Sequence, residues 1–280
     1  MGAPRQDSMG RYELLIELGR GGMAELFLGR LQGAGGFAKL VAIKRILPHL
    51  AQDKQFKEMF LNEGRIAAHL SHPNVCQVFE LDEVDDELFL AMEYLDGVSW
   101  DHLVRELPRD ESSLRLIVGV LAQAAEGLHY AHGLRDLEGQ LTPIIHRDVS
   151  PQNLFVTVDG VCKVLDFGVS KMMTEGPRTR SGVIKGKLPY MAPEQIRGEE
   201  LDGRADVFAL GVCAWEAIAG ERLYDRASDF MIGKAIIEED APSIATHWPD
   251  CPPAVDAVIR RALDRDRERR HASARDFGTA

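Results

Sequence analysis

The sequence has 280 residues, of which 45% are hydrophobic and 28% are charged, and its formal net charge is −11. A chain of this length lies near the limit for one hydrophobic core, so we expect two lobes. The acidic balance excludes general binding to nucleic acids or to acidic lipid surfaces, because phosphate groups attract basic proteins. The four cysteines have no CxxC or zinc spacing, which favours reduced thiols in a cytoplasmic chain.

The two ends of the chain are expected to be a flexible tail and a truncated helix. Residues 1–10 lack a secretion signal and predict a flexible tail. No apolar run approaches the roughly 18 residues that span a membrane, so we expect no membrane contact from this segment. The chain stops soon after Ser273, a candidate helix cap, which suggests a truncated C-terminal helix. A longer parent protein could carry a membrane anchor beyond Ala280.

The first predicted hairpin is joined by glycines. Residues 12–18 and 25–29 have strand patterns, and Gly19-Arg20-Gly21-Gly22 lies between them. A dinucleotide-binding fingerprint would instead join a strand to a helix. The glycine cluster alone is weak evidence for a nucleotide site.

The next strand and helix predict a buried ion pair. Strand periodicity in residues 40–46 places Ala42 and Lys44 on one face, where a flat base could lie beside a cation that reaches phosphates. In the predicted helix 55–70, Glu63 falls inside the apolar stripe, where a carboxylate is costly without a cation. Lys44 is the expected partner, although an isolated strand lysine is more often solvated.

The middle of the chain predicts a change from strands to helices. Residues 76–84 and 87–95 read as a second hairpin, after which the smaller lobe, residues 11–95, should end. The remainder, residues 96–280, is expected to be mainly helical. Two helices are clearest. The first has an apolar stripe formed by Leu114, Ile117, Val118, Leu121, Ala125 and Leu128. The second, residues 205–219, is apolar almost all round, so Asp206 at its start should be buried.

A third hairpin is predicted around Asp159-Gly160, the strongest short signal for a two-residue turn. If Val158 pairs with Val161, Asn153 faces Asp166 across the hairpin. Directly opposed residues lie about 5 Å apart, and amide and carboxylate oxygens suit Mg²⁺. The hairpin therefore predicts a metal clamp.

A third acidic group, Asp148, lies on the loop that enters the same hairpin. A carboxylate beside a metal-bound phosphate can orient a hydroxyl and accept its proton. Aspartate and asparagine are also ordinary turn formers, so each residue alone is weak evidence. Together, at this spacing, they indicate a catalytic site.

The motifs HRDVSPQN at 146–153, DFG at 166–168, VAIK at 41–44 and APE at 192–194 resemble those of the eukaryotic-type (Hanks-type) serine/threonine protein kinases, bacterial members above all. The resemblance covers about residues 12–277. It implies an α+β, bilobal fold with a small antiparallel sheet lobe containing one main helix and a larger, mainly α-helical lobe. ATP and Mg²⁺, with Mn²⁺ as an alternative, would bind between them.

The resemblance also implies residue roles at the nucleotide. The family's contacts correspond to Leu18, Gly19, Arg20, Gly21, Gly22, Met23, Ala24, Glu25, Leu26, Ala42, Lys44, Met92, Glu93 and Leu95. Ala24 stands where the family has a third glycine, and its methyl group could reduce nucleotide affinity. Met92 would be the gatekeeper, although simple core packing explains it equally well.

For catalysis, the resemblance implies that Asp148 orients the acceptor hydroxyl, that Asn153 and Asp166 hold metal, and that Lys44, held by Glu63, places ATP. Two structural roles follow as well. Asp206 would hold the backbone of the catalytic loop, and Trp215 would pack nearby. The family's buried glutamate–arginine pair would be formed by Glu194 and Arg270.

One departure from the family concerns Ser150 and Lys187. Serine/threonine kinases usually have lysine at the first position and threonine at the second, so the cation has changed place while the charge is kept. We expect Lys187 to reach Asp148 and the γ-phosphate, with Ser150 supplying the hydroxyl. A solvated lysine in a loop is the alternative.

The expected activity is phosphoryl transfer from ATP to serine or threonine hydroxyls of protein substrates, in signalling. Arg147, next to the catalytic aspartate, suits a loop that is ordered by phosphate, so we expect autophosphorylation at Thr179 and Ser181, rather than at Thr174, in trans through self-association. Two other functions remain open. A pseudokinase would bind nucleotide and partners without turnover, and a kinase-like phosphotransferase would act on a small molecule.

Overall fold

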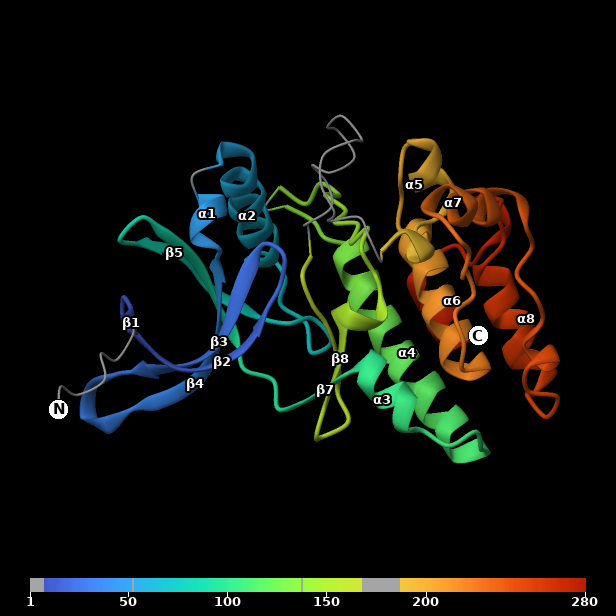
Figure 1. The fold of residues 1–280 in the computed structure, drawn as a ribbon, viewed down its shortest axis with the longest axis horizontal. Helices are drawn as coiled ribbons and strands as arrows, with labels where there is room; N and C mark the ends of the chain where they lie inside the picture. Colours follow the sequence, from blue (N-terminus) through green and yellow to red (C-terminus); the bar gives the residue numbers. More distant parts are fainter. Residues whose placement is uncertain (1–7, 52, 137, 168–186) are drawn as a thin grey trace. The chain divides into compact units, whose positions relative to one another are not determined.

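The computed structural model describes residues 8–51, 53–136, 138–167 and 187–280 (Figure 1). It divides into two compact units. The N-terminal unit comprises Met1–Ser71 and Cys76–Asp96, and the C-terminal unit comprises His72–Val75 and Gly97–Ala280. Among the helices of the described residues, none has both the length and the apolar composition needed to cross a lipid bilayer.

The N-terminal unit is a six-stranded antiparallel sheet with the strand order β1-β2-β3-β4-β6-β5. Its strands are β1 (Ser8–Met9), β2 (Tyr12–Arg20), β3 (Ala24–Gln32), β4 (Ala38–Ile46), β5 (Val78–Val84) and β6 (Glu87–Glu93). Strand β1 lies in the stretch that the sequence predicts to be a tail. That prediction is wrong for Ser8 and Met9, because the Met9 side chain is buried in an apolar cluster and β1 pairs with β2.

Two apolar clusters form the core of this unit. One contains Val41 and Ile43 of β4, so the intervening Ala42 and Lys44 face the opposite side of the sheet. The other cluster packs sheet residues against Phe60 of α2 (Lys54–Ala67), which follows α1 (Pro48–Ala51). Helix α2 begins at an Asp53 cap and ends three residues before the predicted position.

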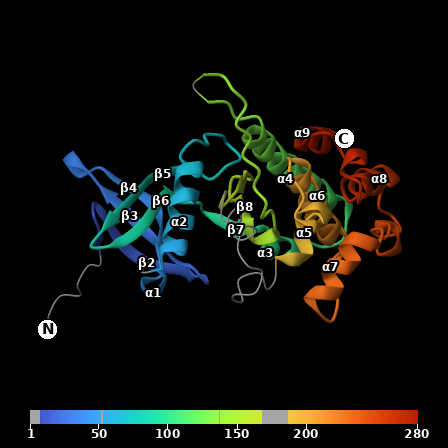
Figure 2. The ribbon, with the colours of Figure 1, turned by 90° about the horizontal axis from the view of Figure 1, so that it is seen from above.

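The C-terminal unit is mainly helical (Figure 2). Its helices are α3 (Trp100–Glu106), α4 (Glu111–His132), α5 (Pro193–Arg197), α6 (Arg204–Ala219), α7 (Asp229–Glu238), α8 (Pro253–Ala262) and α9 (Ala274–Thr279). A three-stranded sheet consists of β7 (Gly97–Ser99), β8 (Leu154–Thr157) and β9 (Cys162–Val164). Helix α6 packs against α4, α8 and α9, and it is buried on nearly every side, as the sequence predicts.

Two details of this unit differ from the predictions. The segment His72–Val75 packs with the C-terminal unit, because Asn74 bonds to Cys162 and Gln123. On α4, Val118 is 44% exposed although the predicted apolar stripe includes it. The stripe is therefore narrower than predicted.

The hairpin of β8 and β9 is offset by one residue from its predicted register. Val156 pairs with Cys162, and three residues, 158–160, form the loop. The Val161 amide donates to Thr157 Oγ1 at 3.1 Å, and Gly160 has a left-handed φ of +78°. This arrangement is typical of a three-residue hairpin loop. The predicted two-residue turn is wrong, and so is the direct pairing of Asn153 with Asp166.

The conformation of Gly160 can be tested by two alanine substitutions. An added Cβ would meet no atom within 4 Å at either Gly160 or Gly119, but only Gly160 has positive φ. We expect Gly160→Ala to lower the free energy of unfolding by about 1–2 kcal/mol. Gly119→Ala, inside α4, should raise it by up to about 1 kcal/mol. Urea unfolding measures both values, and equal effects would contradict the loop assignment.

Candidate active site

The predicted ion pair in the N-terminal unit is present. Lys44 Nζ lies 2.6 Å from Glu63 Oε1, and the two side chains are 17% and 7% exposed. Lys44 comes from the sheet and Glu63 from α2, so the pair also joins these two elements. A buried carboxylate without its cation would be strongly destabilising, which gives the pair a structural role as well.

The glycine cluster forms a strand–turn–strand unit, as predicted. The Gly21 amide donates to the Ala24 carbonyl at 2.8 Å, and the Leu47 amide donates to the Met23 carbonyl at 3.0 Å. A Cβ added at Gly19 or Gly22 would meet no atom within 4 Å. The turn therefore has an uncrowded backbone, as close approach of phosphates requires.

Ala24 packs beside the apolar cluster of Ile46 and Phe60. Its methyl group thus has a place in the core of the N-terminal unit. This packing gives the alanine a structural reason to replace the family's third glycine.

The other predicted nucleotide contacts occupy neighbouring strands. Ala42 is directly opposite Met92, and Lys44 is directly opposite Leu26, in the antiparallel registers of β4. Met92 also packs against the Ile46 cluster, as its core-packing interpretation requires. The Gln77 amide donates to Glu93 Oε1 at 2.7 Å, so that carboxylate has a partner within its own unit. Leu18 is exposed, whereas Leu95 is partly buried.

In the C-terminal unit, a network of hydrogen bonds fixes Asp148. This residue is 9% exposed, and Asn153 Nδ2 donates to its Oδ2 at 2.9 Å and to its carbonyl at 2.8 Å. Lys187 Nζ donates to the same Oδ2. No hydrogen bond to Asp148 Oδ1 is found within the described residues. Within this part of the chain, both side-chain bonds thus go to the same oxygen of the carboxylate.

Asp206 anchors the loop that carries Asp148. Its two oxygens accept the amides of His146 and Arg147, each at 2.8 Å, and His132 Nε2 lies 2.7 Å from Oδ2. Burial favours a higher pKa for Asp206, but the hydrogen bond and charge of His132 hold the pKa below its usual value. The predicted role of Asp206 in holding the loop backbone is confirmed. Trp215 is buried in the same helix, and its Nε1 donates to the Pro242 carbonyl.

Two residues near this anchor have left-handed backbones, Arg147 with a φ of +67° and Asp166 with a φ of +57°. For residues with side chains, such conformations cost of order 1–3 kcal/mol and persist where surrounding contacts impose them. The Asp206 bond to the Arg147 amide is one such contact. Two of the four non-glycine residues with positive φ in the described part of the chain thus lie beside the candidate catalytic residues, and the other two, Asp85 and Asp86, lie in the turn between β5 and β6.

The predicted metal ligands, Asn153 and Asp166, lie close together in the structure. Although the register is wrong, the Leu165 amide donates to the Asn153 carbonyl at 2.9 Å, which brings Asp166 next to that pair. Because the Asn153 amide nitrogen binds Asp148, its amide oxygen is the atom left for a cation. Amide and carboxylate oxygens fit Mg²⁺, which completes its shell with waters and phosphates. No group of three or more His, Cys, Asp or Glu in the described residues could hold a metal by itself.

Of the two positions that depart from the family, Lys187 has the predicted contact with Asp148, whereas a contact of the Ser150 hydroxyl is not found among the described residues. The contact of Lys187 with Asp148 agrees with the predicted direction of this side chain, which is 43% exposed. Ser150 is 1% exposed, and its Oγ has no hydrogen-bond partner among the described residues. The predicted phosphorylation positions Thr179 and Ser181 lie outside the described residues.

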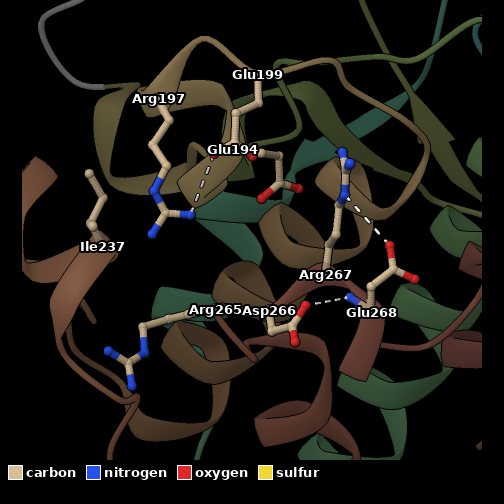
Figure 3. Close-up of a pocket in the computed structure, with 8 residues that line it drawn as sticks. All are labelled: Glu194, Arg197, Glu199, Ile237, Arg265, Asp266, Arg267 and Glu268. Atoms are coloured by element: carbon tan, nitrogen blue, oxygen red, sulfur yellow. Dashed lines mark hydrogen bonds and ion pairs between the residues drawn. The ribbon is translucent and has the colours of Figure 1, made fainter.

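The predicted pair of Glu194 and Arg270 is also present. Two parallel bonds of 2.6 and 2.8 Å join the side chains, which are 3% and 0% exposed. Beside it lies a pocket of about 460 Å³ lined mainly by charged side chains (Figure 3). The pocket includes none of the candidate catalytic residues. Gln195 links this region to the catalytic loop, because its Nε2 donates to the Arg147 carbonyl at 3.0 Å.

A further polar cluster was not predicted. Tyr190 Oη donates to Glu216 Oε2 at 2.8 Å, Arg222 contacts both groups, and the Leu223 amide donates to Glu216 Oε1. Burial raises the pKa of Glu216 to about 7. An acidic residue inside the apolar helix 205–219 was a signal for this cluster, as it was for Asp206.

The sequence matches the protein kinase domain family over residues 12–277. The chain belongs to the protein kinase family. Among solved structures, this kinase domain is similar to the PknI kinase domain of Mycobacterium tuberculosis, with a TM-score of 0.70 and 28% identity, over 100% of this chain and 98% of that one. The bilobal α+β fold predicted from the sequence is thereby confirmed.

Curated relatives differ in the acceptor that their names give. The domain is 42% identical over 99% of its length to "Tyrosine-protein kinase MasK" of Myxococcus xanthus. It is 31% identical over 95% of its length to "Serine/threonine-protein kinase PknB" of Mycolicibacterium smegmatis. The chain covers 43% and 42% of these two proteins, respectively, so it spans less than half of their lengths.

The buried Glu216 predicts a pH dependence of stability. Its pKa is about 7 in the folded protein against an ordinary value of 4.5, so the folded state binds more protons in that interval. Stability should therefore fall as the pH rises from about 4.5 to 7. Relative to wild type, Glu216→Gln should gain about 3 kcal/mol of unfolding free energy across this interval, as linkage requires. Denaturant titrations at several pH values measure this difference, with exposed Glu106→Gln as the control. A pH-independent difference for Glu216→Gln would contradict the assignment.

Proposed function

We propose that this kinase domain transfers the γ-phosphoryl group of ATP to serine or threonine hydroxyls of proteins. The arrangement around Asp148 carries the proposal. Lys187 and Asn153 engage one carboxylate oxygen, while the other would orient an acceptor hydroxyl. Seven similar proteins have names that give serine/threonine kinase activity, against one, MasK, that is named a tyrosine kinase, and this majority favours serine and threonine acceptors.

In the proposed reaction, the acceptor oxygen forms a bond to the γ-phosphorus, and the bond from that phosphorus to the β–γ bridging oxygen breaks. The hydroxyl proton passes to Asp148, and ADP leaves. Little covalent work falls to the protein in such a transfer, so its residues act mainly by positioning and charge. Lys44, held by Glu63, would bind the α- and β-phosphates. Mg²⁺ held by Asn153 and Asp166 would neutralise phosphate charge.

Lys187 has two roles in this proposal. Its ammonium group fixes the Asp148 carboxylate, and it supplies a cation beside the transferring phosphate. Electrostatic stabilisation of developing charge is usually a leading catalytic contribution. The cation that the family has at position 150 would thus be supplied from position 187.

We also propose that the domain regulates itself by trans-autophosphorylation at Thr179 and Ser181, and that it works in the cytoplasm. The first idea is supported by Arg147 beside Asp148, because a guanidinium can bind a phosphate through two bonds. The second is supported by the four cysteines, all buried as thiols.

Phosphotransfer can be tested with γ-³²P-ATP, Mg²⁺ and a protein acceptor. We expect wild type to label serine or threonine and Asp148→Asn to be slower by about 10²–10⁴-fold, the usual contribution of a general base. Asp225→Asn changes an exposed aspartate and is the matched control. Phosphoamino acid analysis and site mapping identify the acceptor residues. Equal labelling by wild type and Asp148→Asn would refute the proposal. Nucleotide binding without transfer would favour a pseudokinase, and exclusive labelling of tyrosine would overturn the serine/threonine assignment.

The role of Lys187 requires a separate set of variants. We expect Lys187→Met to lower kcat by about 10²-fold, as loss of one electrostatic contact to the transition state typically does. Lys185→Met should change kcat little. The double swap Ser150→Lys with Lys187→Thr should recover part of the activity, because it restores a cation at the family's position. Steady-state kinetics measure all three, and a wild-type kcat in Lys187→Met would exclude the proposed role.

A further inference from the structure

Three charged residues form a row across the N-terminal sheet. Arg20 of β2, Glu25 of β3 and Arg45 of β4 are directly opposed in the antiparallel registers. Glu25 Oε1 accepts a bond from Arg20, and Oε2 accepts bonds from Arg45 at 2.8 and 3.2 Å. Each oxygen of one carboxylate thus holds a different arginine.

Burial makes this row more than a surface ion pair. Glu25 is 4% exposed, so its charge is costly unless the arginines compensate it. Arg45 is itself restrained by Glu87 at 3.2 Å and by the Phe27 ring, whose centroid lies 4.9 Å from its guanidinium carbon. Arg20, by contrast, is 61% exposed at the end of β2. Arg45 is therefore the restrained end of the row. Arg20 is the exposed end, and its position depends on its bond to Glu25.

The row of Arg20, Glu25 and Arg45 connects the glycine turn to β4, the strand that carries Lys44. Arg20 and Glu25 are the last cross-strand pair before residues 21–23, which form the turn. Arg45 follows Lys44 on β4, and neighbouring residues of a strand face opposite sides. Lys44 binds Glu63 on one side, and Arg45 binds Glu25 on the other. The glycine turn is thus fastened to the strand that carries Lys44.

We propose that Glu25 is a positioning residue for the nucleotide, acting through Arg20 and Arg45 to hold the glycine turn in register with Lys44. This inference rests on the proposed function, since it concerns the phosphate groups of the same nucleotide. It differs from the direct contacts expected for Arg20 and Glu25 from the sequence. In the structure their side chains bind each other.

The same hairpin contains a matched control. Glu13, 8% exposed, accepts bonds from Arg30 at 2.6 and 2.9 Å and from Gln32 at 2.7 Å. This buried carboxylate also pairs with arginine across β2 and β3, but it lies at the end of the hairpin far from the glycine turn. Loss of either charge should disturb the hairpin, and only loss of Glu25 should disturb the turn.

The test compares Glu25→Gln with Glu13→Gln in two measurements. Calorimetry gives the dissociation constant of Mg·ADP, and hydrogen exchange of residues 19–26 reports the turn in the nucleotide-free protein. We expect Glu25→Gln to weaken Mg·ADP binding about tenfold, which corresponds to about 1.4 kcal/mol. It should also accelerate exchange at the turn. Glu13→Gln should leave both values near wild type.

Arg20→Gln helps to distinguish a row of side chains that holds the turn, here called a clamp, from direct contact of Arg20 with phosphate. Because Arg20 is exposed, this variant should fold even if Glu25→Gln does not. In a clamp, Glu25→Gln and Arg20→Gln both weaken binding and both accelerate exchange. If Arg20 itself bound phosphate, Glu25→Gln would release it, and binding would stay the same or strengthen. That result, or equal effects of Glu25→Gln and Glu13→Gln, would overturn the inference. If wild type failed to bind Mg·ADP, the proposed function would be refuted. The hydrogen-exchange data would still test whether Glu25 holds the glycine turn.

Discussion

The candidate active site depends first on one buried carboxylate, Asp206. It lies in α6, a helix that is buried on nearly every side, and it accepts the amides of His146 and Arg147. Those bonds hold Arg147 in a left-handed backbone that would otherwise relax. Asp148 follows directly, so the direction of its side chain is fixed by a helix 58 residues further along the chain, the distance from Asp148 to Asp206 in the sequence. The placement of the catalytic carboxylate therefore depends on the strained loop, and the loop depends on the buried helix that carries Asp206.

The same rule governs the other buried acids. Glu63, Glu194 and Glu25 are each buried, and each binds a lysine or an arginine from a different element. Burying a charge is unfavourable unless a partner and hydrogen bonds compensate it, and breaking such a pair costs more than forming it gains. Paired charges thus act as specific joints between elements, whereas the apolar clusters supply most of the cohesion.

The buried charged pairs also show which parts of the structure could be predicted from the sequence. Glu63 and Asp206 each interrupt an apolar helical pattern, so their burial was predictable. The pairing of Glu63 with Lys44 followed from the need for a cation, whereas the role of Asp206 followed from the resemblance to protein kinases. The loop of β8 and β9 was not, because the choice between two and three loop residues depends on the Thr157 hydroxyl as well as on Asp159-Gly160. Strand β1 depends on pairing and packing with residues elsewhere in the N-terminal unit, which its short local pattern does not encode, and the apolar pattern around Glu216 signals a buried acid but not its partner Tyr190.

The exchange at Ser150 and Lys187 places the cation in a partly hydrated position. Ser150 is 1% exposed, whereas Lys187 keeps 43% of its side chain exposed while it contacts Asp148. A partly hydrated ammonium pays a smaller desolvation penalty for the same carboxylate. The domain therefore keeps a cation at Asp148 but carries it on the segment that leads to α5. As a result, the electrostatics of Asp148 depend on the position of that segment, and not on the catalytic loop alone.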